Sequence, residues 1–155
     1  MPENLEIYSA DATFVDVVVP LIEQSFSPEY GEAWTRSQCQ SMLMLHSCRL
    51  TLADYGGQSC GFMITRRAAD EEELLLFAVT PQFRGKKIGT KMLSHFIDTA
   101  RQNKIERLFL EVRSNNPAVQ LYEDIGFFLI GKRKGYYKGT ENSRFDAHTY
   151  RLDLI

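Results

Sequence analysis

Hydrophobic positions along this chain alternate between short strand-like runs and longer helix-like repeats. Residues 74–79 form an unbroken apolar run, which is typical of a strand that is covered on both faces. Pro81 ends that run, because proline cannot donate to a strand ladder. Apolar residues then recur at helical spacing from Ile88 to Ile97, and this spacing predicts a helix that begins near Lys86.

The same two periodicities predict the other elements. Alternating or apolar runs predict strands at residues 5–8, 49–54, 58–67, 106–113, 127–131 with 136–137, and 145–154. A helix over 14–26 follows Asp11 as its N-cap, and Pro20 is expected to kink or break it. Thr35 and Gln38 fit a capping box, so a second helix is expected to run to about His46.

A last short helix through Ala118, Leu121 and Tyr122 should end at Gly126, where glycine suits the left-handed residue after a helix. The resulting element order is β-α-α-β-β-β-α-β-α-β-β. Strands and helices that follow each other irregularly predict an α+β fold, because a doubly wound sheet requires strict alternation.

Composition limits the possible functions. A chain of 155 residues predicts one domain, residues 1–155, and a net charge of −2 argues against a nucleic-acid partner. No apolar run approaches the roughly 20 residues that span a membrane. The three cysteines lack CxxC spacing and predict reduced thiols and a cytoplasmic location, and the three histidines lack metal-ligand spacing, so we expect no metal.

The first candidate site is the basic loop that joins the apolar strand to the next helix. Unpaired N–H groups and the helix dipole at such a junction favour an anion. The loop departs from the Walker A pattern and from G-x-G-x-x-G, in which Lys87 would occupy a glycine position. The alternative to an anion site is that these residues are simply the basic, solvent-exposed start of a helix.

From Arg84 to Gly89 the loop resembles motif A of the GNAT acetyltransferase superfamily, [RQ]-x-x-G-x-[GA]. This resemblance implies that the loop holds the pyrophosphate of acetyl-coenzyme A. It also implies a single-domain GNAT fold, in which about four helices flank a mixed, mostly antiparallel twisted sheet of about seven strands. Lys87 stands where the family usually has its first glycine, and we expect it to adopt ordinary helical dihedral angles.

A second stretch, residues 110–127, resembles the GNAT signature S-N-x-x-A-x-x-L-Y-x-x-x-G-F that follows the central helix. Together with Trp34, Tyr136–Tyr137 and Asp146–Ala147, it is similar to the bacterial ribosomal-protein alanine N-acetyltransferase subfamily. Here Arg113 directly precedes the serine of the signature, so the loop beside the reaction centre is one residue shorter than usual.

The resemblance assigns roles to individual residues. Glu111 is the expected base, directly or through water, and Tyr122 the expected acid that protonates the leaving thiolate. Glu72 or Glu73 is the alternative base. Central-strand backbone groups and Asn115 would bind the cofactor's acetyl group and pantetheine arm. The expected cofactor contacts are Phe77, Ala78, Val79, Arg84, Gly85, Lys86, Lys87, Ile88, Gly89, Thr90, Asn115 and Tyr122.

Both catalytic residues also have purely structural interpretations. Glu111 would then be a strand carboxylate that is paired with Arg107 or Arg113. Tyr122 would be a core tyrosine whose hydroxyl is satisfied by a neighbour.

The hypothesis is an N-acetyltransferase that uses acetyl-coenzyme A as co-substrate and a protein or peptide N-terminal α-amine as acceptor. An α-amine, with a pKa of about 8, costs only about 1.4 kcal/mol to deprotonate at pH 7, whereas a lysine costs about 4.6 kcal/mol. The alternatives are a small-molecule amine or lysine acceptor, and a coenzyme A-binding module without activity. The chain is expected to be a monomer or a homodimer.

Overall fold

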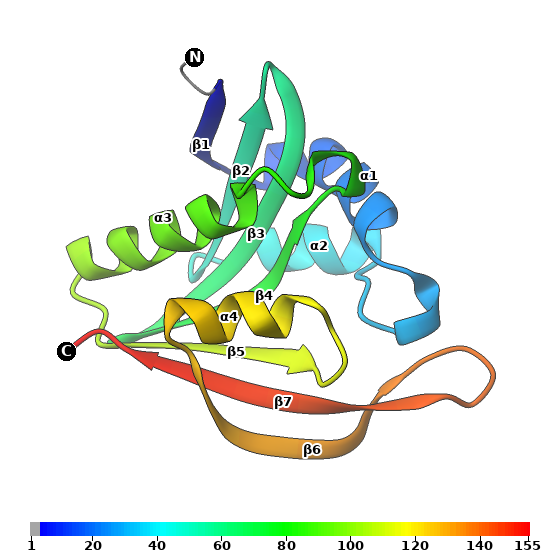
Figure 1. Cartoon of the computed structure of the whole chain (residues 1–155). Coiled ribbons are helices and arrows are strands. Elements are labelled where there is room, and N and C mark those ends of the chain that lie inside the picture. The colour runs from blue at the N-terminus through cyan, green and yellow to red at the C-terminus, as the bar shows by residue number, and fades with distance from the viewer. Residues whose placement is uncertain (1–3) are drawn as a thin grey trace.

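A seven-stranded sheet forms the centre of the structure, a computed structural model that describes residues 4–155 (Figure 1). Residues 1–3, which the expected domain includes, lie outside the described residues. The strands are β1 (Leu5–Ala10), β2 (Cys48–Tyr55), β3 (Gln58–Ala68), β4 (Glu71–Val79), β5 (Arg107–Arg113), β6 (Phe128–Lys138) and β7 (Arg144–Asp153). The helices are α1 (Val15–Ser25), α2 (Arg36–Leu43), α3 (Ile88–Gln102) and α4 (Ala118–Ile125). This order confirms the one expected from the sequence.

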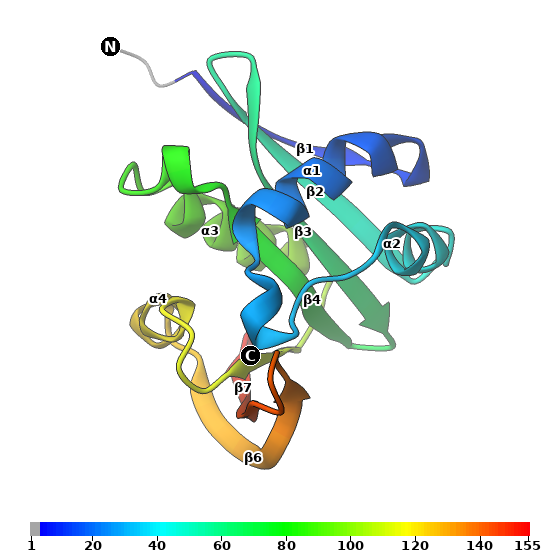
Figure 2. The ribbon, with the colours of Figure 1, turned by 90° about the vertical axis from the view of Figure 1, so that its right-hand side faces the viewer.

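The strands lie in the order β1-β2-β3-β4-β5-β7-β6. Neighbouring strands are antiparallel except for β4 and β5, which are parallel, so the sheet is mixed and mostly antiparallel as predicted. Helices α3 and α4 cover one face and α1 and α2 cover the other (Figure 2). Two buried apolar clusters, one on each face, form the core.

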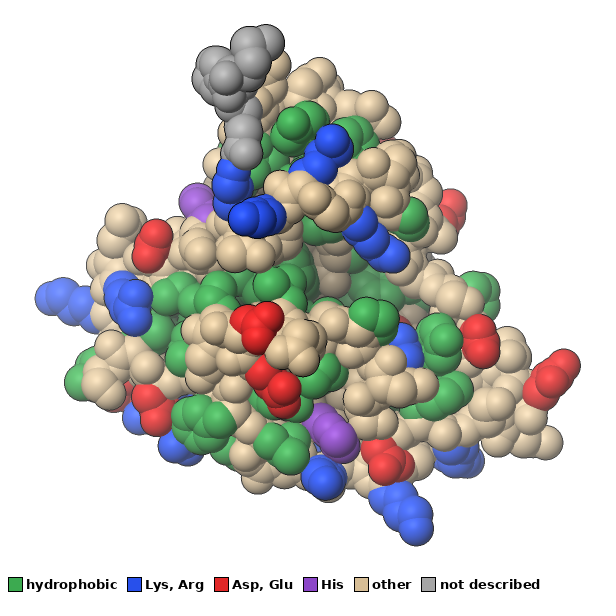
Figure 3. Space-filling model, viewed as in Figure 1, with side chains coloured by type: hydrophobic (Ala, Val, Ile, Leu, Met, Phe, Trp, Pro, Cys, Tyr) green, Lys and Arg blue, Asp and Glu red, His purple; other side chains and the backbone are tan. Residues whose placement is uncertain are grey.

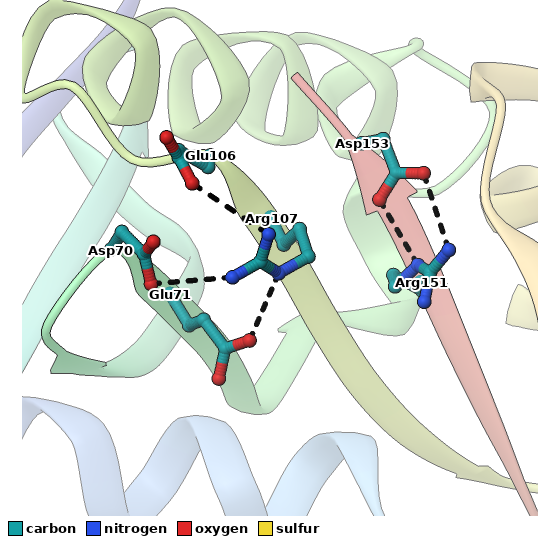
Figure 4. A network of polar contacts seen from close by, with 6 residues as sticks. All are labelled: Asp70, Glu71, Glu106, Arg107, Arg151 and Asp153. Atoms are coloured by element: carbon teal, nitrogen blue, oxygen red, sulfur yellow. Dashed lines mark hydrogen bonds and ion pairs between the residues drawn. The ribbon is translucent and has the colours of Figure 1, made fainter. Parts of the chain in front are cut away.

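The pairing of β4 with β5 is short and sets the position of the site. Residues 71–74 pair with residues 107–110, and beyond them the two strands are no longer paired. Arg107 ties the paired end together, with its Nε 3.0 Å from Glu71 Oε2 and its Nη2 3.4 Å from Asp70 Oδ1 (Figure 4). Asp70 and Glu71, at the start of β4, therefore close one end of the gap between the two strands.

Helix α3 matches its predicted periodicity but begins later than expected. Its first residue is Ile88, because a 3₁₀ turn, η3 (Pro81–Phe83), and the loop after it occupy the preceding residues. The apolar positions that predicted the helix are buried, as the 3.6-residue period requires: Ile88, Met92, Leu93, Phe96 and Ile97.

Two helix predictions are wrong in detail. Asp11 caps a short 3₁₀ turn, η1 (Ala12–Phe14), and α1 then continues through Pro20 without a break. Pro20 is exposed while Val18 and Leu21 on either side are buried, so the missing hydrogen bond falls on the water-facing side of the helix. Helix α2 has the predicted capping box but ends at Leu43, three residues before the expected end.

Strand β6 is longer than its sequence suggested. The two predicted pieces form one strand, which is bulged against β7 between Leu129 and Gly131 and again between Arg133 and Tyr137. At the second bulge the N–H of Gly135 donates to Asp146 Oδ1 at 2.9 Å. This bulge includes Tyr136 and ends at Tyr137, and so helps to place the two tyrosines beside the end of β5 that is not paired with β4.

Candidate active site

Two clefts meet at the unpaired end of β4 and β5. The larger, of about 690 Å³, lies between the end of α1, the loop before α3 and the start of α4. Figure 3 shows the hollow on this face, below a group of Lys and Arg side chains. The smaller, of about 250 Å³, lies beside β5 and the Tyr136–Tyr137 pair. Five residues line both clefts: Phe26, Glu32, Phe77, Asn116 and Tyr122.

The loop before α3 lines the larger cleft through every residue from 84 to 90 except Lys86. The Lys86 ammonium instead lies over the Tyr55 ring, 5.4 Å from its centroid. Gly89 is tightly packed, because an added Cβ would lie 3.2 Å from Leu121 on α4. The main chain of this loop and the first turn of α3 therefore form one wall of the cleft, with the helix N-terminus suited to an anion.

Lys87 departs from its predicted conformation. It is the N-cap residue of α3 and has φ 62° and ψ 20°, in the left-handed region, whereas the sequence led us to expect helical angles. The chain reverses here to enter α3, and this turn requires the conformation that glycine adopts without cost. Lys87 thus has the backbone conformation of a glycine and also carries a cation at the cleft wall.

The end of β4 supplies main-chain groups to the same cleft. Phe77, Ala78 and Val79 line it, as expected. The N–H of Thr80 donates to the Cys60 carbonyl on β3 at 2.9 Å, and main-chain groups along a strand alternate in direction. The main-chain groups of Val79 and Phe77 therefore point away from β3, toward β5, where the two strands are no longer paired. Arg84 Nε donates to the Val79 carbonyl at 3.1 Å, so one of these acceptors is already used.

Tyr122 stands where the two clefts meet. Its side chain projects from α4, its ring centroid is 6.3 Å from that of Phe77, and the residue is only 5% exposed. Burial, and to a lesser degree the charge of Glu32, raises the pKa of the Tyr122 phenol above its usual value of 10.0. The phenol is consequently protonated at neutral pH, as a proton donor must be.

Glu111 lines only the smaller cleft, and its partners differ from those expected. Its Oε2 lies 3.3 Å from Arg133 Nε and accepts a hydrogen bond from Thr149 Oγ1 at 3.4 Å. The predicted alternative, a pair with Arg107 or Arg113, is wrong, because both arginines bind other carboxylates.

The two alternative bases, Glu72 and Glu73, differ in their burial and in whether they line a cleft. Glu72 is 3% exposed, accepts from Thr65 Oγ1 at 2.7 Å and from Arg67 Nε at 2.9 Å, and lines neither cleft. Glu73 lines the smaller cleft and pairs with Arg66 at 2.9 Å. Glu72 is thus a structural carboxylate, and of these two alternatives it is Glu73 that lines the smaller cleft with Glu111.

Sequence patterns gave no signal for Glu32, which lies in the loop before α2. Its side chain is 11% exposed and its Oε1 lies 2.6 Å from Arg113 Nε. A single glutamate in an irregular loop fits no periodicity or motif, so only the folded chain reveals its place between the clefts. Asn115, which the sequence did predict, lines the larger cleft.

Within residues 4–155 no group of three or more His, Cys, Asp or Glu side chains is arranged to hold a metal ion. None of the helices in that part of the chain is both long and apolar enough to cross a membrane.

Three features together indicate the class of protein. They are a mixed sheet whose central strands separate, a helix N-terminus suited to an anion, and a protonated phenol between two clefts. A family model described as "Acetyltransferase (GNAT) family" matches residues 16–127. The chain belongs to this family and is a GNAT-type N-acetyltransferase with the α+β fold of its members. Acetyltransferases of this family use acetyl-coenzyme A as co-substrate.

The chain is also similar to individual acetyltransferases of known name. The chain is 30% identical to the ribosomal protein bS18-alanine N-acetyltransferase of Escherichia coli (strain K12) over 136 residues, which cover 87% of this chain and 82% of the relative. It is 39% identical over 119 residues to the enzyme of the same name from Salmonella typhimurium, covering 76% and 71% of the two chains. The crystal structure of the Escherichia coli enzyme superposes with a TM-score of 0.88 at 26% identity, covering 97% of this chain and 94% of that one.

Proposed function

We propose that this chain transfers the acetyl group of acetyl-coenzyme A to the N-terminal α-amine of a protein, and that residues 1–155 form one acetyltransferase domain. The observation that carries the proposal is the position of Tyr122, whose buried ring lines both the larger and the smaller cleft. The larger cleft is the cofactor site and the smaller one the acceptor site, so donor and acceptor meet at one protonated phenol.

The larger cleft suits the cofactor in three ways. The cofactor's diphosphate binds at the α3 N-terminus, against main-chain amides of residues 85–89 and the Lys87 cation. The pantetheine arm lies along the outward-facing main-chain groups of Phe77 and Val79, with Asn115 opposite. The thioester then reaches Tyr122 at the junction of the clefts.

The chemistry follows from the charges that change during the transfer. The neutral amine attacks the thioester carbonyl, the C–S bond breaks, and the thiolate that leaves takes a proton. Tyr122 donates that proton, because a phenol kept protonated by burial lies beside the thioester. Glu111 accepts the proton that the amine loses, directly or through water, since it lines the acceptor cleft. Glu73 is the second candidate for this role.

The relatives support a ribosomal-protein N-terminus as the acceptor. Their printed names specify an alanine of ribosomal protein bS18, and the match to the Escherichia coli enzyme extends over most of both chains. An α-amine also suits a base that is already engaged in an ion pair, because it costs only about 1.4 kcal/mol to deprotonate.

Two measurements test the proposal. Titration calorimetry of the purified chain with acetyl-coenzyme A should show binding, and absence of binding would reject the cofactor site. Thiol release should then follow addition of a peptide with an N-terminal alanine. The same peptide with a blocked N-terminus is the control, and equal or faster release with polyamines or Nα-acetyl-lysine would reject the α-amine acceptor.

A further inference from the structure

A buried ion pair bridges the unpaired end of the sheet, beside Tyr122. Arg113, the last residue of β5, is 5% exposed and its Nε lies 2.6 Å from Glu32 Oε1. The Arg113 guanidinium also stacks on the Tyr30 ring, 3.6 Å from its centroid. The pair therefore fixes the loop before α2 to the end of β5.

Each partner of this pair also holds a residue of the loop that leads into α4. Arg113 Nη1 donates to Asn115 Oδ1 at 2.6 Å, and Asn116 Nδ2 donates to Glu32 Oε2 at 3.0 Å. The other side-chain atom of Asn116, Oδ1, accepts from the N–H of Ala118, the first residue of α4, at 2.8 Å. A continuous chain of hydrogen bonds thus runs from Glu32 to the N-terminus of α4.

Tyr122 lies one turn along the same helix from Ala118. Since α4 has only eight residues, the position of its first turn largely sets where the phenol stands. We propose that Glu32 is a positioning residue for acetyl transfer, which orients Tyr122 through Asn116 and holds Asn115 through Arg113. This inference rests on the proposed function and adds Glu32 to it as a residue that orders the reaction centre.

Glu32 is better suited to hold its neighbours than to take a proton. Both of its oxygens are occupied, one by a guanidinium and one by an amide. The proposed proton acceptor remains Glu111 or Glu73, and the contribution of Glu32 is geometric. Misplacement of a reacting group by about 1 Å can cost about 100-fold in rate.

The pair between Arg67 and Glu72 supplies a matched control. Its carboxylate is also buried and its Nε–Oε1 distance is 2.9 Å, but neither residue lines a cleft. Arg67→Gln and Arg113→Gln each remove the guanidinium that pairs with a largely buried carboxylate, so both should lower thermal stability.

The kinetic test compares Glu32→Gln, Arg113→Gln and Arg67→Gln with the wild-type chain. We expect kcat to fall about 10- to 100-fold in the first two, while the KM of Glu32→Gln for acetyl-coenzyme A stays within about twofold. Arg67→Gln should retain kcat despite its lower stability. A kcat for Glu32→Gln within about twofold of that of Arg67→Gln would overturn the proposal.

Hydrogen exchange gives a readout that does not depend on turnover. Glu32→Gln should accelerate exchange at the amides of Ala118 and Val119, and Arg67→Gln should not. A wild-type chain that fails to transfer acetyl groups would overturn the proposed function. Unchanged exchange at these amides in Glu32→Gln would overturn the positioning role of Glu32.

Discussion

The Nε of Arg133 lies 3.3 Å from Oε2 of Glu111, so the expected base is in an ion pair with a cation of the neighbouring part of the sheet. Arg133 is 61% exposed, whereas Glu111 is 20% exposed. The arginine can therefore swing into solvent while the carboxylate remains in the smaller cleft. Arg133 also stacks on Tyr136, with 5.0 Å between the guanidinium carbon and the ring centroid.

Arg133→Gln should increase kcat/KM for the peptide acceptor about two- to fivefold, because an exposed ion pair of this kind is worth roughly 0.2–1 kcal/mol and competes with the acceptor for Glu111. Steady-state rates at low salt test this. Arg151→Gln is the control, since Arg151 pairs with Asp153 outside the clefts (Figure 4). A lower kcat/KM for Arg133→Gln would mean that Arg133 assists the acceptor.

Tyr122→Phe should lower kcat about 100-fold or more, because it removes only the hydroxyl that we propose as the proton donor to the thiolate. Tyr150→Phe is a matched control: Tyr150 is 2% exposed and its hydroxyl donates to Glu123, but it lines neither cleft. Glu111→Gln should also lower kcat. Near-wild-type turnover of both Tyr122→Phe and Glu111→Gln with an α-amino peptide would reject these assignments.

The substitution Lys87→Gly distinguishes the effect of the Lys87 backbone conformation on stability from the effect of its charge on cofactor binding. Glycine removes the cost of the left-handed backbone, so the free energy of unfolding should rise by about 1 kcal/mol. Loss of the ammonium should weaken acetyl-coenzyme A binding severalfold, with a smaller effect at high salt. Lys87→Ala should weaken binding equally without the gain in stability, because its Cβ keeps the strain. Urea unfolding and calorimetry measure the two effects, and tighter binding by Lys87→Gly would contradict a role for this cation.

The three cysteines should differ in reactivity toward a thiol reagent. Cys39 and Cys60 are fully buried and Cys48 is half-buried. Burial raises the pKa of Cys39 and of Cys60 from 9.0 to about 11, so few thiolates form at these sites near pH 8. One thiol should therefore react rapidly in the native chain and all three in urea. Cys48→Ala should abolish the rapid phase, and its persistence would refute the assignment.

Stability should fall as the pH rises from about 9 toward 11. The pKa of each buried thiol is higher in the folded chain than the unfolded value of 9.0, so the unfolded chain releases protons first and is favoured in this range. Below pH 9 the two thiols have no such effect. Urea midpoints between pH 8 and 11 check this, with Cys39→Ala expected to flatten the slope. A midpoint independent of pH up to 11 would disprove it.

Local interactions in the sequence determined most of the secondary structure. The capping box at Thr35, the glycine after α4 and the apolar spacing of α3 each depend on residues within about four positions of one another, so they can be read without the fold. The two motifs likewise predicted residues that line the larger cleft, from Arg84 to Thr90 with the exception of Lys86, and Asn115.

Tertiary structure decided the features that depend on distant parts of the chain. The left-handed conformation of Lys87 follows from the direction in which α3 must leave the loop. Glu111 pairs with Arg133 because of the order of β5, β7 and β6 in the sheet, which no local pattern encodes. The pair between Glu32 and Arg113 joins residues 81 positions apart. Such contacts form only when the whole sheet brings the segments together, because their energies depend on burial and distance and are independent of sequence spacing.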